Sequence, residues 1–94
     1  MLNRYVAAGM VAEAHEGRRI LVLSIHGRDA RASMDECLHH ADEADLLRVT
    51  RANGAERITF NSGGRIIFRS VQGHGHRGVS VDTVYADTGE IIRA

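Results

Sequence analysis

The side chains best suited to chemistry in this sequence are arginines, and half of them fall in one stretch. All twelve basic residues of the 94-residue chain are Arg, yet the formal net charge is zero. Residues 46–81 carry a local charge of +5 with one acid, Glu56, whereas residues 1–45 carry −3. Guanidinium groups suit phosphate oxygens because they donate two parallel hydrogen bonds. The candidate nucleic-acid contacts are Arg48, Arg51, Arg57, Arg65, Arg69 and Arg77.

An alternating pattern in this stretch predicts that several arginines share one face of a sheet. If Ile66 and Phe68 point into the core, then Arg65 and Arg69 point outward, and Arg57 does the same on the neighbouring strand. The chain has few aromatic residues to stack on bases. We therefore expect weak, salt-sensitive binding to phosphates without sequence preference. The alternative is that these are solvated charges spread over different faces.

Other polar groups give weaker signals. His74 and His76 have a spacing that occurs in metal sites, but the sequence places no third ligand beside them. A glycine-rich loop without a ligand is an equally good interpretation, so no metal or cofactor is expected. The single cysteine, Cys37, excludes an intrachain disulfide and is typical of a small buried side chain.

The elements that position these residues begin with a helix over residues 2–16, which Gly17 should end. The apolar run 20–25 predicts a buried strand of the parallel type. Ser33 with Glu36 forms a capping-box pattern, which predicts a second helix from there to about residue 44.

Beyond residue 45 the pattern changes to a period of two, with Leu47 and Val49 expected on the core side. The turn sequences at 53–54 and 61–64 separate short strands of an antiparallel meander, and residues 79–86 predict a last strand. The prediction is one α/β domain over residues 1–94, a small mixed sheet with two helices.

The stretches ITFNSGGRIIFRS at 58–70, Arg77-Gly78 and VDTVYAD at 81–87 resemble the core of phage terminase large subunits and related RecA-like packaging and helicase ATPases. The stretch GRRILVLS at 17–24 resembles a strand of the same folds. The resemblance implies a truncated RecA-like core fragment, a phage origin, and a degenerate Walker B aspartate at Asp87.

The chain departs from this family where phosphate chemistry is concerned. It contains no lysine, and Met1 stands at the first helix, where a phosphate-binding loop would precede it. Thr88 stands where the family usually has its catalytic glutamate. We therefore expect no ATP hydrolysis and no enzymatic activity.

The leading hypothesis is a non-catalytic remnant of a RecA-like ATPase that forms a homo-oligomer, even a ring, and binds DNA non-specifically or docks on a partner. Arg77 and the 73–78 loop would lie near the joint between copies. One alternative is an ATPase subunit whose phosphate loop comes from another chain, and another is a phage protein that binds a host protein. The longest apolar run has four residues, so no membrane span and a cytoplasmic location are expected.

Overall fold

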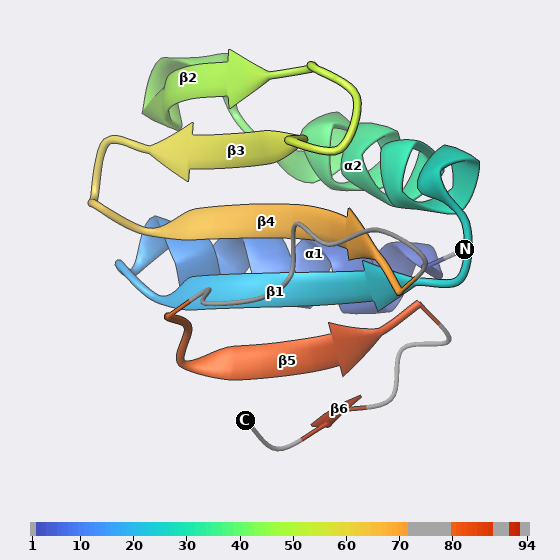
Figure 1. Ribbon diagram of the computed structural model, residues 1–94. Helices are drawn as coiled ribbons and strands as arrows, with labels where there is room; N and C mark the ends of the chain where they lie inside the picture. The colour runs from blue at the N-terminus through green and yellow to red at the C-terminus, as the bar shows by residue number, and fades with distance from the viewer. Residues whose placement is uncertain (1, 72–79, 88–90, 93–94) are drawn as a thin grey trace.

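A computed structural model describes residues 2–71, 80–87 and 91–92 of the chain. Helices, a 3₁₀ turn and strands follow one another in an α/β arrangement (Figure 1). Their bounds are α1 (Arg4–His15), β1 (Arg19–Ser24), α2 (Gly27–His40), η1 (Glu43–Asp45), β2 (Leu46–Thr50), β3 (Arg57–Phe60), β4 (Arg65–Ser70), β5 (Thr83–Ala86) and β6 (Ile91–Ile92).

The strands form one mixed sheet in the order β2-β3-β4-β1-β5-β6. The central strand β1 is parallel to both of its neighbours, β4 and β5, and the remaining pairs are antiparallel. Ile20, Leu21 and Val22 of β1 are all buried, which is typical of a strand covered on both faces. The predicted α/β class, the parallel-type strand and the antiparallel meander are confirmed. The strand predicted over 79–86 is shorter, Thr83–Ala86, and it is not the last one, because β6 follows it.

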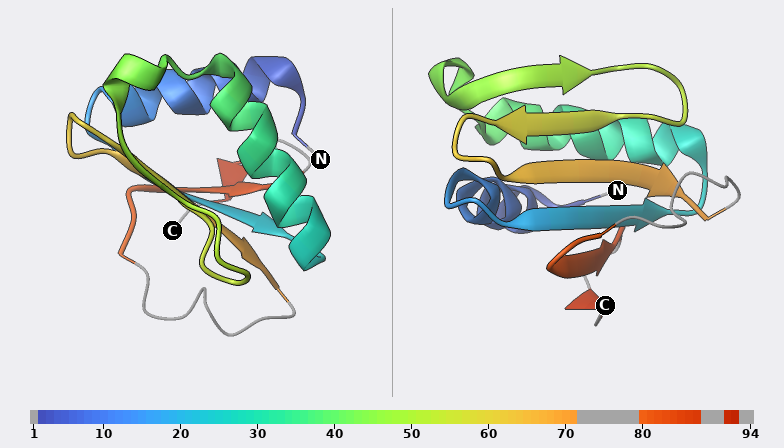
Figure 2. Two further views of the ribbon diagram at one scale, coloured as in Figure 1. Left: turned by 90° about the horizontal axis from the view of Figure 1, so that it is seen from above. Right: turned by 60° about the vertical axis from the view of Figure 1, so that its left-hand side comes forward.

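Both helices lie on one face of the sheet (Figure 2). The main core lies between them and the sheet, and contains Met10 and Met34 from the helices with Val22, Ile66 and Phe68 from the strands. A smaller buried cluster of Leu21, Ile67 and Val84 lies on the opposite face. Neighbouring residues of a strand point to opposite faces of the sheet. The two clusters therefore fix which face each remaining side chain of β1, β3 and β4 points to.

The first helix lies within the predicted range 2–16, and it ends before Gly17 as the sequence predicts. Asn3 caps it, because the Asn3 side-chain oxygen accepts a hydrogen bond from the Val6 N–H at 2.9 Å. Gly17 follows the helix with φ of 100°, in the left-handed region that glycine adopts without strain.

The start of the second helix was predicted wrongly. α2 begins at Gly27, six residues before Ser33, and ends at His40. Ala30, Met34 and Cys37 form its buried stripe, so the helical period extends one turn upstream of the capping-box pattern. Ser33 lies inside the helix and is fully buried, and its hydroxyl donates a hydrogen bond to Asp87.

The position of Leu47 was also predicted wrongly. The pairing of β2 with β3 shifts between Leu46 and Arg48, as in a β-bulge, and Leu47 is 68% exposed rather than on the core side. After the shift, Arg48 pairs with Thr59 and Val49 with Ile58. None of the helices in the described ranges is long and apolar enough to cross a membrane.

Gly64, in the turn before β4, lies close to the end of α1. An added Cβ would lie 1.8 Å from the Ala14 carbonyl oxygen, so we expect Gly64→Ala to lower the free energy of unfolding by roughly 3 kcal/mol. Gly9→Ala is the matched control, because no atom lies within 4 Å of its added Cβ. Urea denaturation should show this control unchanged or more stable by about 0.5–1 kcal/mol. Equal stability of the two variants would contradict the close approach.

Candidate nucleic-acid interface

The face of the sheet that points away from the helices carries most of the predicted arginines. Strand register aligns Arg48 with Thr59, Thr59 with Arg65, and Arg65 with Arg19. At the usual strand spacing this row spans roughly 14 Å across β2, β3, β4 and β1. Arg57 lies on the same face, two residues before Thr59. We call Arg48, Arg57 and Arg65 the arginine face.

Two members of the arginine face are exposed to solvent. Arg48 and Arg57 are exposed, and neither forms an ion pair or hydrogen bond with any residue that the structure describes. A guanidinium group without an internal partner keeps all five of its N–H donors available. These two side chains are therefore available as phosphate contacts.

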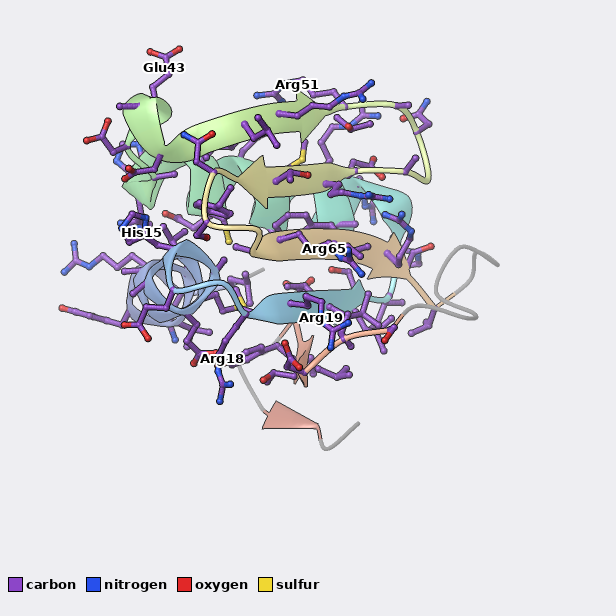
Figure 3. The ribbon with its side chains drawn as sticks, turned by 90° about the vertical axis from the view of Figure 1, so that its left-hand side faces the viewer. His15, Arg18, Arg19, Glu43, Arg51 and Arg65 are labelled. Carbon is purple, nitrogen blue, oxygen red and sulfur yellow. The ribbon has the colours of Figure 1, made fainter. Side chains whose placement is uncertain are left out.

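The third member, Arg65, is partly engaged with the chain that leads into β5. Its Nη2 donates to the Ser80 carbonyl oxygen at 3.2 Å. Its neighbour Arg19 binds Asp82 through both the backbone N–H and the guanidinium, with Nη2 and Oδ1 3.1 Å apart. Figure 3 shows Arg19 and Arg65 side by side on their two strands. These contacts hold residues 80–82 against the start of β1.

The hydrogen bond from the Arg19 guanidinium is the main cause that lowers the pKa of the Asp82 carboxyl. The backbone N–H of Arg19 lowers it further. The charge of the Asp82 carboxylate is therefore matched by Arg19. It does not cancel the charge of Arg48 or Arg57.

Arg69 lies on the expected face but is 8% exposed, not solvated as its outward direction predicts. Its Nη1 donates to the carbonyl oxygens of Glu56 at 2.9 Å and Phe68 at 2.8 Å. Burial is the main cause that lowers its pKa, followed by the nearby charge of Arg57. In this position the guanidinium ties β4 to the residue before β3, which is a structural role.

The remaining predicted contacts lie elsewhere. Arg51 follows β2 and pairs with Asp35 of α2, with Nη1 and Oδ1 3.1 Å apart. Arg77 lies outside the described residues, as do His74, His76 and the 73–78 loop. The structure therefore brings three of the six arginines together on an accessible face.

The position of Glu56 is a feature that sequence reasoning missed. This acid is 3% exposed and points to the helix side of the sheet, where its carboxylate lies 3.8 Å from the Arg31 guanidinium. The sequence contains a signal for this direction. Glu56 directly precedes Arg57, and because Arg57 points outward, strand alternation turns Glu56 towards the helices. The single acid of the basic stretch therefore leaves the arginine face uncompensated.

Asp87, predicted as a degenerate Walker B aspartate, follows the carboxyl end of β5. The Ser33 hydroxyl of α2 donates to its Oδ1 at 2.9 Å, and its N–H donates to the Leu23 carbonyl oxygen. Within the described ranges no group of three His, Cys, Asp or Glu side chains could hold a metal ion. Burial raises the pKa of the Cys37 thiol to about 12, so this cysteine is unreactive.

No protein-family model, curated protein or solved structure matches this chain.

The Arg19–Asp82 pair gives a prediction about acid stability. Because the folded state lowers the pKa of Asp82 below its usual value of 3.8, the carboxylate stabilises the folded protein at neutral pH. This stabilisation is lost as the pH falls below 3.8 and through the lowered pKa. We expect Asp82→Asn to reduce stability at pH 7 and to reduce it less at about pH 2.5, because wild-type Asp82 takes up a proton as the pH falls. Urea midpoints of both proteins at the two pH values check this. A difference that stays the same at acid pH would rule the ion pair out as its cause.

Proposed function

We propose that this chain is a non-catalytic nucleic-acid-binding module that contacts phosphates through its arginine face and works as a homo-oligomer. The observation that carries the proposal is the exposure of Arg48 and Arg57, without partners among the described residues, on a face whose neighbouring carboxylate is paired. Charged side chains on one flat face suit a polyanion because they neutralise several phosphates at once.

The same face favours recognition of the backbone over recognition of bases. The aromatic side chains of the sheet, Phe60, Phe68 and Tyr85, pack in the helix-side core. Stacking on bases needs aromatic rings at the surface, and the described part of the arginine face offers Thr59 and arginines instead. Binding should therefore be non-specific, with a Kd of about 10⁻⁴ to 10⁻⁶ M at physiological salt.

The proposed lineage is a remnant of a RecA-like ATPase. The resemblance of residues 17–24, 58–70 and 81–87 to that family supports it, as does the place of Asp87 directly after a strand parallel to β1. In such a remnant, Asp87 serves the fold through Ser33 instead of holding magnesium.

The arginine face can be tested with paired substitutions of equal charge. Arg48→Gln with Arg57→Gln should weaken binding to a duplex by at least about tenfold at low salt. The slope of log K against log salt should fall from about −2.7, for three phosphate contacts, to about −0.9. Fluorescence anisotropy of a labelled duplex over a salt series measures both quantities.

The matched control is Arg4→Gln with Arg28→Gln, which removes the same charge from the two helices. This control should bind like the wild type. An equal loss in both double variants would show attraction to net charge only, and no binding even at low salt would refute the proposal.

We also expect no magnesium-dependent ATP hydrolysis by the chain, because it has no lysine for the phosphates and Thr88 follows Asp87. A phosphate-release assay with Asp87→Ala as the control tests this. Hydrolysis that disappears in Asp87→Ala would favour the ATPase-subunit alternative.

A further inference from the structure

The β2 edge of the sheet has features that suit a second copy of this chain. β2 is the outermost strand, and its outer side is hydrogen-bonded to no strand that the structure describes. Its bulge turns Leu47 into solvent at 68% exposure, the only large apolar side chain of the strand that is exposed in this way. An open edge with an exposed leucine can pair with another strand.

Charge is distributed along this edge with opposite signs at the two ends. Asp42, Glu43 and Asp45 lie just before β2, and Arg48 and Arg51 lie in it and just after it. Glu43 points away from the rest of the chain (Figure 3), and no described residue pairs with it. Antiparallel pairing of two such edges brings opposite charges together, whereas parallel pairing would superpose like charges.

We propose that β2 pairs with β2 of a second copy, antiparallel and about a two-fold axis. Leu47 then lies opposite Leu47 of the second copy, because a residue on the axis meets its own equivalent. Leu46 and Arg48 then pair across the axis, and the acidic turn at residues 43–45 lies just beyond this short ladder, beside the end of β2 in the second copy that carries Arg51. The contact thus has an apolar centre, and at each of its ends an acidic turn lies near a basic strand end.

This interface deepens the proposed function, and rests on it for the homo-oligomeric state. Two antiparallel neighbours in one sheet are related by an axis perpendicular to that sheet. The arginine faces of both copies therefore lie on one side of a continuous sheet, and all helices lie on the other. Joining two weak phosphate-binding faces raises the overall affinity without any new contact to the nucleic acid.

Cysteine cross-linking tests the two-fold directly. In Leu47→Cys the two new thiols face each other, so mild oxidation should give a disulfide-linked dimer that a reductant reverses. Ile25→Cys is the matched control, because Ile25 is 62% exposed and lies after β1, away from β2. The native Cys37 is fully buried and should not interfere.

We expect Leu47→Cys to cross-link at least about tenfold faster than Ile25→Cys, and sedimentation should give the wild type twice the monomer mass of 10.3 kDa. Equal cross-linking rates, or a wild type that is monomeric at about 100 µM, would overturn the interface.

Charge reversal provides a second test that does not depend on oxidation. Glu43→Arg should raise the dimer dissociation constant by about tenfold. Arg51 also pairs with Asp35 of its own chain, so Arg51→Glu is added to Glu43→Arg, and the double variant should bind more tightly than Glu43→Arg alone. Additive losses in the double variant would refute the pairing. A wild type that is monomeric but binds nucleic acid contradicts this interface alone, whereas a dimeric wild type that binds no nucleic acid contradicts the proposed function.

Discussion

Placement of both helices on one face of a mixed sheet is the constraint on which the rest of this structure depends. Helix side chains fill the space over Val22, Ile66 and Phe68, and Gly64 lets the sheet approach α1 closely enough to close that core. Because strand residues alternate, burying one set turns the other set outward. The arginines of β2, β3 and β4 therefore lie together on the outer face because the opposite face packs against the helices.

The same alternation separates positive from negative charge. Glu56 falls on the buried side and pairs with Arg31, while its neighbour Arg57 falls on the outer side and stays unpaired among the described residues. Asp82 stands at the end of the row and is matched by Arg19. A chain with no net charge thus presents a face whose charge is positive, and this is the physical basis for attraction to a polyanion.

Local patterns predicted the parts of the fold that depend on nearby residues. The apolar run of β1, the helix end at Gly17 and the alternation in β4 were read correctly from short windows. The predictions that were wrong concern side chains whose contacts join residues far apart in the sequence. Ser33 is a buried partner of Asp87 rather than a helix cap, and Arg69 is held by a carbonyl thirteen residues away. Neither contact leaves a periodic trace in the sequence.

The most direct test of the central claim is a nuclear magnetic resonance titration of isotope-labelled protein with a short duplex at low salt. We expect the side-chain Nε–H signals of Arg48 and Arg57 to shift first, together with backbone signals of β2, β3 and β4. Signals of α1 should stay in place, because that helix lies on the other face of the sheet. Shifts centred on α1 and α2, or no shifts at any duplex concentration, would contradict it.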